Sequence, residues 1–455
     1  MKEKKIKSKL LEMINQKSAK ITVVGLGYVG LPTAAHFANM GFQVTGFDTN
    51  PKIVSQINNL TLQTREPGLE KLVLNARQKG YLSATSISTK ALSEADIFIV
   101  CVQTPVDHEG NANLSFLQSA FAEIAKFLKK GTLVIIQSTV PPMTINTLIV
   151  PLLEDNHGLK CGVDFWLAYC PERMAPGNGL LDIAVNPRLI GVYDSESAVL
   201  CSALFQLGTN GKLLITDISS AEVSKLAENT FRYVNIAFAN ELALICKQIN
   251  VDVNEVIKLA NTHPRVNIHQ PGCGAGGPCL SKDTHLLLKS TKLNPSKTEV
   301  IPAAIRLNSY MPSYIAELAI NALTEKGKTV SKSKIAIFGT AYKGDVDDSR
   351  DSPTEGIICE LKKRKATLIV YDPHCSESFG ERKASSVKEA SMDADCIIIA
   401  TDHKEFLTLN LSEIKQLMKE NPIIVDGKRI ISPAEAKLHG FEYVAMSFVK
   451  QNVAP

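Results

Sequence analysis

The chain has 455 residues, 45% of them hydrophobic and 21% charged, which is typical of a globular protein with about three domains. Its formal net charge of +4 is too small to indicate a nucleic-acid partner, and no stretch approaches the roughly 18 uninterrupted apolar residues of a membrane span. The ten cysteines have no paired or regular spacing, so we expect reduced thiols, no metal site and a cytoplasmic protein.

The chain begins with a basic extension, residues 1–19, which lacks the apolar segment of a secretory signal and is expected to be solvated. A short β-branched strand then leads into Gly25, Gly27 and Gly30, which have GxGxxG spacing before an apolar helical pattern. Glycines there permit a tight turn and the close approach of a pyrophosphate, which a helix N-terminus also favours. The second strand ends at Asp48, about 20 residues after the first glycine, where an acid binds ribose hydroxyls and repels a 2′-phosphate. The pattern predicts an NAD site, and a purely structural strand–turn–helix is the alternative.

Three apolar stretches then read as buried parallel strands, each followed by polar side chains. The stretches are Ala95–Val102, Thr132–Gln137 and Phe165–Cys170. Thr104 follows the first, Thr139 the second, and Glu172 with Arg173 the third. Because ligands bind at the C-terminal ends of strands in open α/β sheets, we expect these side chains to contact cofactor or substrate. Helix caps for the threonines and a surface ion pair for Glu172 and Arg173 are the alternatives.

A long helix is predicted between Asp217 and Asn250, where apolar residues recur mostly at three- and four-residue spacing. Lys225, Asn229 and Arg232 form one stripe, which is either a solvated face or one side of a cleft. Apolar residues also lie around several sides of this helix, so we expect a partner subunit to cover it in a homodimer. A monomer whose own domains cover the helix is the alternative.

The glycine-rich sequence GCGAGGPCLSKD, residues 272–283, is the most distinctive stretch of the chain. Its glycines let the backbone adopt positive φ and pass close to a ligand. Cys279 follows the glycines, and Lys282 nearby can lower the pKa of its thiol, so a thiolate nucleophile is expected. Asp283 comes directly after the lysine. The alternative is a flexible loop with a buried, inert cysteine.

The last third of the chain repeats the order of the first. IAIFGTAYKG parallels ITVVGLGYVG, VYDP parallels GFDTN, and ADCIIIAT parallels ADIFIVCV. We therefore expect an α/β fold in which two Rossmann-like, doubly wound parallel-sheet domains are joined by a central helical domain with a long helix. The predicted domains are residues 20–215 for NAD, 216–328 for the helices, dimerisation and the Cys279 loop, and 329–455 for a second nucleotide site. Lys343 stands in the second turn, where it can meet a phosphate as a point charge.

Five segments together resemble the UDP-glucose/GDP-mannose dehydrogenase family, from about Lys20 to Phe448: GLGYVGLP, STVPP, KLAENTFRYVNIAFANEL, GCGAGGPCLSKD and FGTAYKGDVDDSRDSP. CPERMAPG and ANTHPRVNIHQPG are similar to the branch of the family that acts on UDP-N-acetyl-D-mannosamine. The resemblance implies two successive NAD-dependent oxidations of the sugar's primary alcohol to a carboxylate, through a thiohemiacetal and a thioester on Cys279, as in polysaccharide biosynthesis. It also implies a C-terminal domain that binds the UDP-sugar. Because LSKDT is closer to the UDP-glucose branch, UDP-N-acetyl-D-glucosamine and UDP-glucose stay open as substrates.

The resemblance also assigns roles residue by residue. The catalytic residues it implies are Cys279 as nucleophile, Lys225 as proton donor or acceptor or oxyanion stabiliser, Asn229 as its partner, Asp283 for activating water, and Glu172 and Thr139. The NAD contacts are Gly25, Gly27, Tyr28, Val29, Gly30, Asp48, Thr104 and Thr139. The substrate contacts are Glu172, Arg173, Lys225, Asn229, Arg232, His263, Arg265, Gly276, Tyr342, Lys343, Arg350 and Lys428. In this family the counterpart of Arg265 is often supplied across a dimer.

Two other classes of protein share part of this pattern. A single-step NAD dehydrogenase would have the same first domain and the lysine–asparagine helix, but would need no thiol on the glycine loop. It would release one NADH per substrate instead of two. A non-catalytic, NAD-responsive binding protein would not need Lys225, Asn229, Cys279 and Asp283 together.

Overall fold

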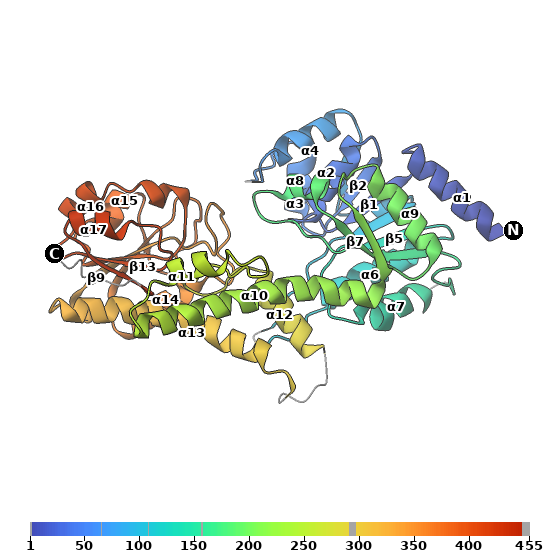
Figure 1. Cartoon of the computed structure of the whole chain (residues 1–455). Coiled ribbons are helices and arrows are strands. Elements are labelled where there is room, and N and C mark those ends of the chain that lie inside the picture. The colour runs from blue at the N-terminus through green and yellow to red at the C-terminus, as the bar shows by residue number, and fades with distance from the viewer. Residues whose placement is uncertain (1, 65, 108, 156–157, 291–296, 448–455) are drawn as a thin grey trace. The chain divides into compact units, whose positions relative to one another are not determined.

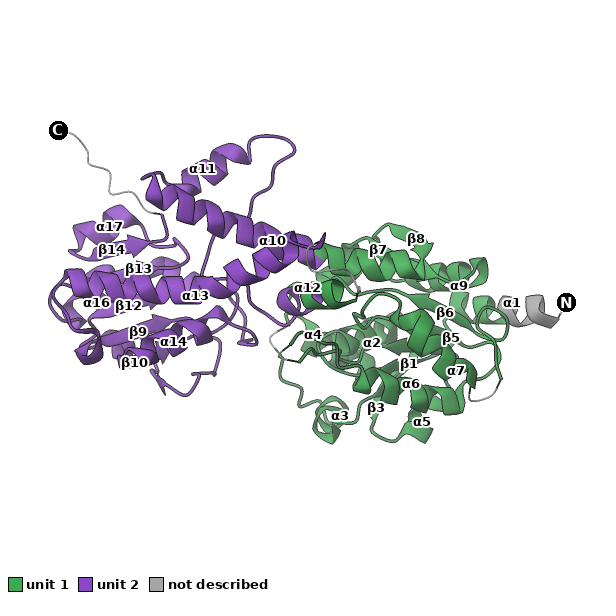
Figure 2. Ribbon diagram, turned by 90° about the horizontal axis from the view of Figure 1, so that it is seen from below, with its two compact units in different colours: residues 1–228, 285–292 green, residues 229–284, 293–455 purple. Residues whose placement is uncertain are grey.

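The computed structural model describes residues 2–64, 66–107, 109–155, 158–290 and 297–447 (Figure 1). The chain forms two compact units, residues 1–228 with 285–292 and residues 229–284 with 293–455 (Figure 2). Each unit contains its own sheet with its own apolar core on both faces, as expected of a doubly wound α/β fold.

In the first unit the described residues form an eight-stranded sheet in the order β3-β2-β1-β4-β5-β6-β7-β8. Its strands are β1 (Lys20–Val24), β2 (Gln43–Phe47), β3 (Leu82–Thr85), β4 (Ile97–Val100), β5 (Leu133–Ile136), β6 (Trp166–Tyr169), β7 (Arg188–Val192) and β8 (Leu213–Asp217). Neighbouring strands pair in parallel, except that β6 and β7 are antiparallel. The predicted strands of this sheet are therefore confirmed to within two residues at either end, whereas the reversal at β7 was not predicted.

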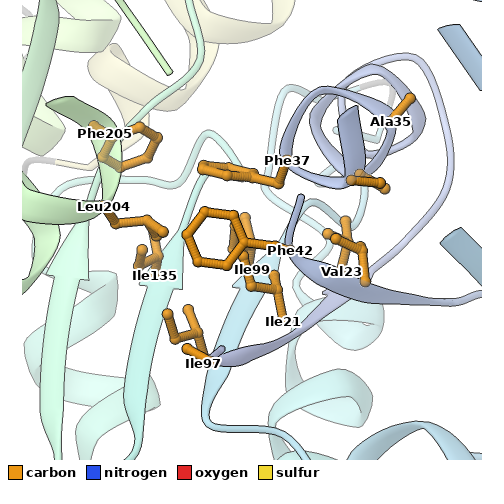
Figure 3. Packing of buried hydrophobic residues seen from close by; sticks show 14 of the residues in the cluster. Ile21, Val23, Ala35, Phe37, Phe42, Ile97, Ile99, Ile135, Leu204 and Phe205 are labelled. Atoms are coloured by element: carbon orange, nitrogen blue, oxygen red, sulfur yellow. The ribbon is translucent and has the colours of Figure 1, made fainter. Parts of the chain in front are cut away.

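Successive residues of these strands point to opposite faces, and both faces are covered by helices. The helices and turns are α1 (Lys2–Asn15), α2 (Gly30–Asn39), α3 (Pro51–Asn58), α4 (Leu69–Gln78), α5 (Ser88–Leu92), α6 (Ser115–Phe127), the π-helical turn η1 (Ile145–Ile149), α7 (Val150–Asp155), α8 (Gly179–Val185) and α9 (Ser195–Gln206). On one face Phe37 of α2 packs between Phe42 and Phe205 of α9, with ring centroids 6.1 and 5.9 Å away (Figure 3).

The start of the chain is helical, which the sequence did not predict. In α1 the side chains of Leu10 and Ile14 are buried in the same core as α2 and α9. Two apolar residues one turn apart therefore attach this basic segment to the first sheet.

In the second unit the described residues form a parallel six-stranded sheet in the order β11-β10-β9-β12-β13-β14. Its strands are β9 (Lys334–Phe338), β10 (Thr367–Tyr371), β11 (Arg382–Lys383), β12 (Cys396–Ile399), β13 (Ile423–Asp426) and β14 (Glu442–Ala445). Its helices and turns are α11 (Val253–Ala260), α13 (Val300–Glu325), the 3-10 turns η3 (Val330–Lys332) and η4 (Lys404–Thr408), α14 (Pro353–Lys363), α15 (Val387–Ser391), α16 (Leu411–Leu417) and α17 (Pro433–Leu438). The repeat of the first sheet that the sequence predicted is confirmed.

The predicted long helix is α10, Ile218–Gln248, a continuous helix of 31 residues (Figure 1). The chain passes from the first unit to the second within it, and it returns briefly to the first within α12, Leu280–Lys289. None of the helices in the described ranges is long and apolar enough to span a membrane.

Candidate active site

The glycine turn of the first unit has the geometry of a dinucleotide-binding turn. Gly25 has a φ of 89° and donates its N–H to the Phe47 carbonyl at 2.8 Å. A Cβ on Gly30 would lie 1.8 Å from the Gly25 carbonyl oxygen, so only glycine lets α2 start this close to the strand. A Cβ on Gly27 would meet no described atom within 4 Å, which leaves the turn open on that side. These features fit the pyrophosphate of NAD.

Asp48 supports this turn and faces it. Its Oδ2 accepts the Leu26 N–H at 2.7 Å, its Oδ1 accepts the Asn50 N–H at 2.8 Å, and the side chain is half-buried. Val29 precedes α2 and Tyr28 is exposed, and in the described residues no side chain caps this helix N-terminus. Backbone donors and an acid at the predicted distance therefore fit a nicotinamide dinucleotide.

The threonines at the strand ends hold two loops together. The Thr104 hydroxyl donates to the Thr139 carbonyl at 2.5 Å, and the Ser138 hydroxyl donates to the Val102 carbonyl at 2.6 Å. The helices that follow these strands begin after other residues: Leu114 precedes α6 and Thr144 precedes η1. Within the described ranges, therefore, neither Thr104 nor Thr139 caps the helix that follows its strand. Thr104 is buried and Thr139 half-buried, so Thr139 is the more accessible of the two.

A buried carboxylate that the sequence analysis missed fixes the loop after Thr139. Glu222 of α10 accepts the N–H groups of Met143 at 2.6 Å and Ile145 at 3.0 Å. Met143 has a φ of 70°, a strained value for a side chain of this size. Burial raises the pKa of Glu222 to about 7, against the two hydrogen bonds that favour its charged form.

Glu172 and Arg173 do not pair with each other's side chains. The Glu172 carboxylate is buried and contacts the Arg188 guanidinium at 3.2 Å, and its Oε1 accepts the Arg173 N–H at 2.8 Å. The Arg173 side chain instead pairs with Glu228 and donates to the Pro187 carbonyl at 2.9 Å. The sequence pattern offered no sign of Arg188 as a partner, because it lies on the next strand.

In the second unit, Asn229 and Asp283 form a buried hydrogen bond. The Asn229 amide donates to Asp283 Oδ2 at 2.6 Å, and Lys282 Nζ lies 3.0 Å from Asp283 Oδ1. Lys225 is also buried, one turn before Asn229 in α10. Two members of the predicted lysine–asparagine–aspartate set are thus in direct contact, and the stripe is not a solvated face at these positions.

Cys279 is exposed and immediately precedes α12, where its carbonyl accepts the Asp283 N–H at 2.9 Å. The buried-cysteine alternative is therefore wrong. The N–H groups of a helix N-terminus favour negative charge beside them, which suits a thiolate.

The glycine loop packs against the turn after β9. A Cβ on Gly276 would lie 2.6 Å from the Asp351 carbonyl, and one on Gly277 would lie 2.6 Å from the Tyr342 ring. Burial, and then the charges of Asp348 and Cys279, raise the pKa of Tyr342 to about 12. The hydrogen bonds that Arg350 donates to the Asp348 carboxylate are the main cause of its raised pKa, to which the Cys279 charge also contributes. Cys279, Tyr342 and Arg350 are therefore brought together within one unit.

The remaining predicted contacts are placed separately. Lys428 pairs with Asp402 at 3.3 Å, and its Nζ would lie 3.7 Å from a Cβ on Gly272, at the start of the glycine loop. Arg232 lies within electrostatic reach of Tyr342, where its charge favours the phenolate. The other side chains of the set are exposed: His263, Arg265 and Lys343.

The glycine loop is also anchored by two buried asparagines that the sequence analysis did not single out. Gly272 N–H donates to Asn240 Oδ1 at 2.8 Å, and Asn240 Nδ2 donates to Asn308 Oδ1 at 3.1 Å. Asn308 Nδ2 then donates to the Tyr233 carbonyl at 3.1 Å. This chain of amides ties the loop to α10 and α13.

Comparison with known proteins agrees with this geometry. Three models of the UDP-glucose/GDP-mannose dehydrogenase family match the chain: the NAD-binding domain over residues 19–208, the central domain over 219–310 and the UDP-binding domain over 336–433. The chain belongs to this family of NAD-dependent oxidoreductases.

Similar proteins within the family share nearly the whole chain. UDP-N-acetyl-D-mannosamine dehydrogenase of Methanococcus maripaludis is 39% identical over 93% of this chain and 95% of its own. The structure of UDP-D-ManNAc dehydrogenase from Pyrococcus horikoshii has a TM-score of 0.88 and 39% identity, covering 94% of this chain and 99% of that one. A UDP-glucose dehydrogenase from Pyrobaculum islandicum has a TM-score of 0.83 at 27% identity, covering 94% and 98%.

Proposed function

We propose that this enzyme oxidises the primary alcohol of UDP-N-acetyl-D-mannosamine to the carboxylate, in two steps that each use one NAD. The observation that carries the proposal is the exposed Cys279 at the start of α12, with Tyr342 and Arg350 of the UDP-binding domain within electrostatic reach. The choice of sugar rests on relatives named UDP-N-acetyl-D-mannosamine dehydrogenase at 37–40% identity.

NAD, when bound, accepts a hydride in each of the two oxidations. In the first, the alcohol loses a proton to a base and becomes an aldehyde. The Cys279 thiolate then adds to the aldehyde carbon, and the thiohemiacetal oxygen is neutralised by a proton. Loss of that proton and of the second hydride gives a thioester, which water hydrolyses to the carboxylate and the free thiol. The two hydrides removed from the sugar carbon reduce two NAD per sugar.

The chain's own residues would supply the protons and hold the charges. We assign Lys225 and Asn229 to the oxyanions that form on the sugar carbon, since one turn of α10 separates them. Asp283, which accepts from Asn229, would orient or activate the water that attacks the thioester. Glu172 and Thr139, which follow β6 and β5, would hold the substrate hydroxyl and water.

The substrate's diphosphate would meet cations of the second unit. The candidate side chains for binding the diphosphate are Arg350, Lys343 and Lys428. Tyr342 and Arg232 would lie beside it, and Gly276, which has no side chain, would let the glycine loop come close to the substrate. NAD would be bound by the glycine turn and by side chains at the ends of the strands: Gly25, Gly27, Tyr28, Val29, Gly30, Asp48, Thr104 and Thr139. We also propose that the domains span residues 20–215, 216–328 and 329–455. In the same proposal the substrate is contacted by three further side chains, Arg173, His263 and Arg265.

Two experiments test this function. NADH released by the purified protein is measured with UDP-N-acetyl-D-mannosamine, UDP-N-acetyl-D-glucosamine and UDP-glucose, and counted per sugar consumed. The expected result is the highest kcat/KM with UDP-N-acetyl-D-mannosamine and two NADH per sugar. A higher kcat/KM with another of these sugars would make that sugar the substrate instead. Release of one NADH per sugar would contradict the two-step reaction.

Cys279→Ser should abolish net NADH production while leaving NAD affinity unchanged, because a serine hydroxyl is far less acidic than a thiol. Cys359→Ser, at another exposed cysteine of the second unit, is the matched control and should keep wild-type turnover. Near-wild-type turnover of the Cys279 variant would remove this thiol from the mechanism.

We further propose a homodimer formed through α10, with Arg265 acting in the partner's site. Phe231, Phe238 and Ile245 recur every seven residues along α10 with exposed fractions of 63%, 48% and 50%. A helix with such a stripe is normally covered. A light-scattering mass near 49.5 kDa would contradict the dimer. Mixing inactive Cys279→Ala with inactive Arg265→Ala should restore some activity if Arg265 acts in trans.

A further inference from the structure

A buried ion pair at the end of β6 includes one residue to which no role has been assigned. Arg188, the first residue of β7, has 7% of its side chain exposed and Glu172 has 6%. The Arg188 Nη1 to Glu172 Oε2 distance is 3.2 Å. Removing two charges from water is costly, and an apolar pair of similar volume is often as stable, so the pair is weak support for a purely structural role.

Arg188 is fixed on its other sides as well. Its Nη2 donates to the Ile183 carbonyl at 3.2 Å, and its guanidinium carbon lies 4.7 Å from the centroid of the Phe205 ring. Burial is the largest single influence on the pKa of Arg188 and lowers it, but Glu172 and Cys170 together outweigh burial and the net pKa is raised. The guanidinium is therefore a charged donor with a fixed position and orientation.

The Glu172 carboxylate is in turn held through both oxygens. Oε2 meets Arg188, and Oε1 accepts the main-chain N–H of Arg173 at 2.8 Å. Each carboxylate oxygen has two lone-pair directions, so one direction on each oxygen stays available for a further donor. The two hydrogen bonds fix the plane of the carboxylate and thus the direction in which it can accept from a sugar hydroxyl or a water.

We propose that Arg188 is a positioning residue that orients the Glu172 carboxylate for its part in sugar oxidation. This inference rests on the function proposed above, in which Glu172 touches the substrate or the water. Arg188 does not itself touch the reacting atoms. It acts through Glu172, so its effect on turnover disappears when Glu172 can no longer play its part.

The same unit offers a matched control. Arg77 is half-buried, whereas Arg188 is buried, and its Nη groups donate to the carbonyls of Leu82 at 2.8 Å and Asn58 at 3.2 Å. Among the described residues no carboxylate pairs with it. Arg77→Met therefore removes a structural arginine without touching Glu172.

The test is a double-mutant cycle with the UDP-sugar that gives the highest turnover in the wild-type protein. Arg188→Met should lower kcat by about 30- to 100-fold and leave the NAD dissociation constant within about twofold, since positioned acid–base groups contribute on the order of 100-fold or more. Glu172→Gln should lower kcat at least as much. In the Glu172→Gln background, Arg188→Met should have no further effect on kcat. Arg77→Met should leave kcat within about twofold.

The outcomes separate two proposals, the role of Glu172 in the reaction and the positioning role of Arg188. Multiplicative losses in the double variant, or unchanged kcat in Arg188→Met, would overturn the positioning role while the role of Glu172 stands. Unchanged kcat in Glu172→Gln would overturn both. If Arg188→Met does not fold, Arg188→Lys takes its place: it keeps the charge but not the planar fork, and about tenfold lower kcat is expected. Wild-type kcat in Arg188→Lys would then overturn the inference.

Discussion

The two sheets contain the same turn, used in two different ways. In the first unit Gly25, with a φ of 89°, donates to the Phe47 carbonyl at 2.8 Å. In the second unit Gly339, with a φ of 95°, donates to the Tyr371 carbonyl at 2.8 Å. In both, an aspartate directly follows the second strand of the motif and accepts N–H groups from the turn. The backbone of the motif is therefore the same, and the surroundings of the acid make the difference.

The two acids differ in what they still have to offer. Asp48 is half-buried, and among the described residues it accepts the N–H of Leu26 and of Asn50. Asp372 is buried and its hydrogen-bonding capacity is filled. Its donors are the N–H groups of Thr340, Ala341, His374 and Cys375 and the ring of His403. We propose that the first acid binds ribose hydroxyls, whereas the second holds its own turn together.

The space beside the turn differs in the same sense. A Cβ on Gly27 would meet no described atom within 4 Å, whereas its counterpart in the second turn, Ala341, already has a Cβ and is buried. The Thr401 hydroxyl also donates to the Ala341 carbonyl at 2.7 Å. Thr401 therefore closes the turn of the second unit that is open in the first. One fold can thus contain a ligand site and a structural element at equivalent positions.

The largest effect that this comparison predicts is on stability. Asp372→Ala leaves several buried N–H groups and His403 without an acceptor, and should lower the free energy of unfolding by about 3–5 kcal/mol. Asp48→Ala should lower it by less than about 1 kcal/mol, because Asp48 is half-buried and accepts from only the N–H groups of Leu26 and Asn50 in the described residues. Urea unfolding of both variants checks this difference. Equal losses in the two variants would mean that the acids are not used differently.

The second effect concerns NAD binding, which should depend more on Asp48 than on Asp372. Asp48→Ala should weaken NAD binding by about 1.5–3 kcal/mol, roughly 10- to 150-fold, and relax discrimination against NADP, because it removes a charged acceptor for the ribose hydroxyls. Titration of NAD and NADP against the purified variant measures both changes. An unchanged NAD dissociation constant would reduce Asp48 to a structural role like that of Asp372.

Half of this comparison could be predicted from the sequence. The glycine spacing and the distance to Asp48 predicted the first site, and the parallel between VYDP and GFDTN predicted the second turn. The sequence could not indicate that Asp372 is saturated, since His403 lies 31 positions away along the chain. Periodicity and local motifs report a residue's own element and face, but not which partner from another strand meets it.

The same reason explains the site residues that sequence reasoning missed. Glu222 contacts a loop 77 positions earlier, and Asn240 contacts Asn308 68 positions later. Each has an ordinary place in an amphipathic helix, where a buried polar residue breaks the apolar stripe. That break is the one signal that could have singled them out. Cys279, in contrast, was recognisable because glycine density and the following charged residues are adjacent in the chain.

The third prediction uses pH. Burial is the largest single influence on the pKa of Asp372 and raises it, but the His403 ring and the N–H groups of Cys375 and Ala341 together lower it by more, so the net pKa is depressed. Because the folded-state pKa is depressed, the stabilisation is complete above the unfolded-state pKa of about 3.9 and is lost as pH falls toward the folded-state value. Between pH 5 and pH 2 the wild-type protein should lose about 2 kcal/mol more than Asp372→Asn. Parallel unfolding curves over this range would show that Asp372 has no depressed pKa.

The smallest effect separates an open turn from a filled one. Gly27→Ala should change the free energy of unfolding by less than about 0.5 kcal/mol, because the added Cβ meets no described atom and Gly27 is not among the residues with positive φ. It should still weaken NAD binding about tenfold, or about 1.4 kcal/mol, because the pyrophosphate must pass close to the turn. In the second turn Ala341 already fills the position of Gly27. Gly339→Ala, at the position equivalent to Gly25, has a positive φ and would put its Cβ 2.3 Å from Thr401, so it should destabilise the fold and leave NAD affinity unchanged. Thermal unfolding and NAD titration of the two variants give four values. If Gly27→Ala lowers stability and spares NAD binding, the first turn is a packed structural element, and the contrast between the two sheets does not hold.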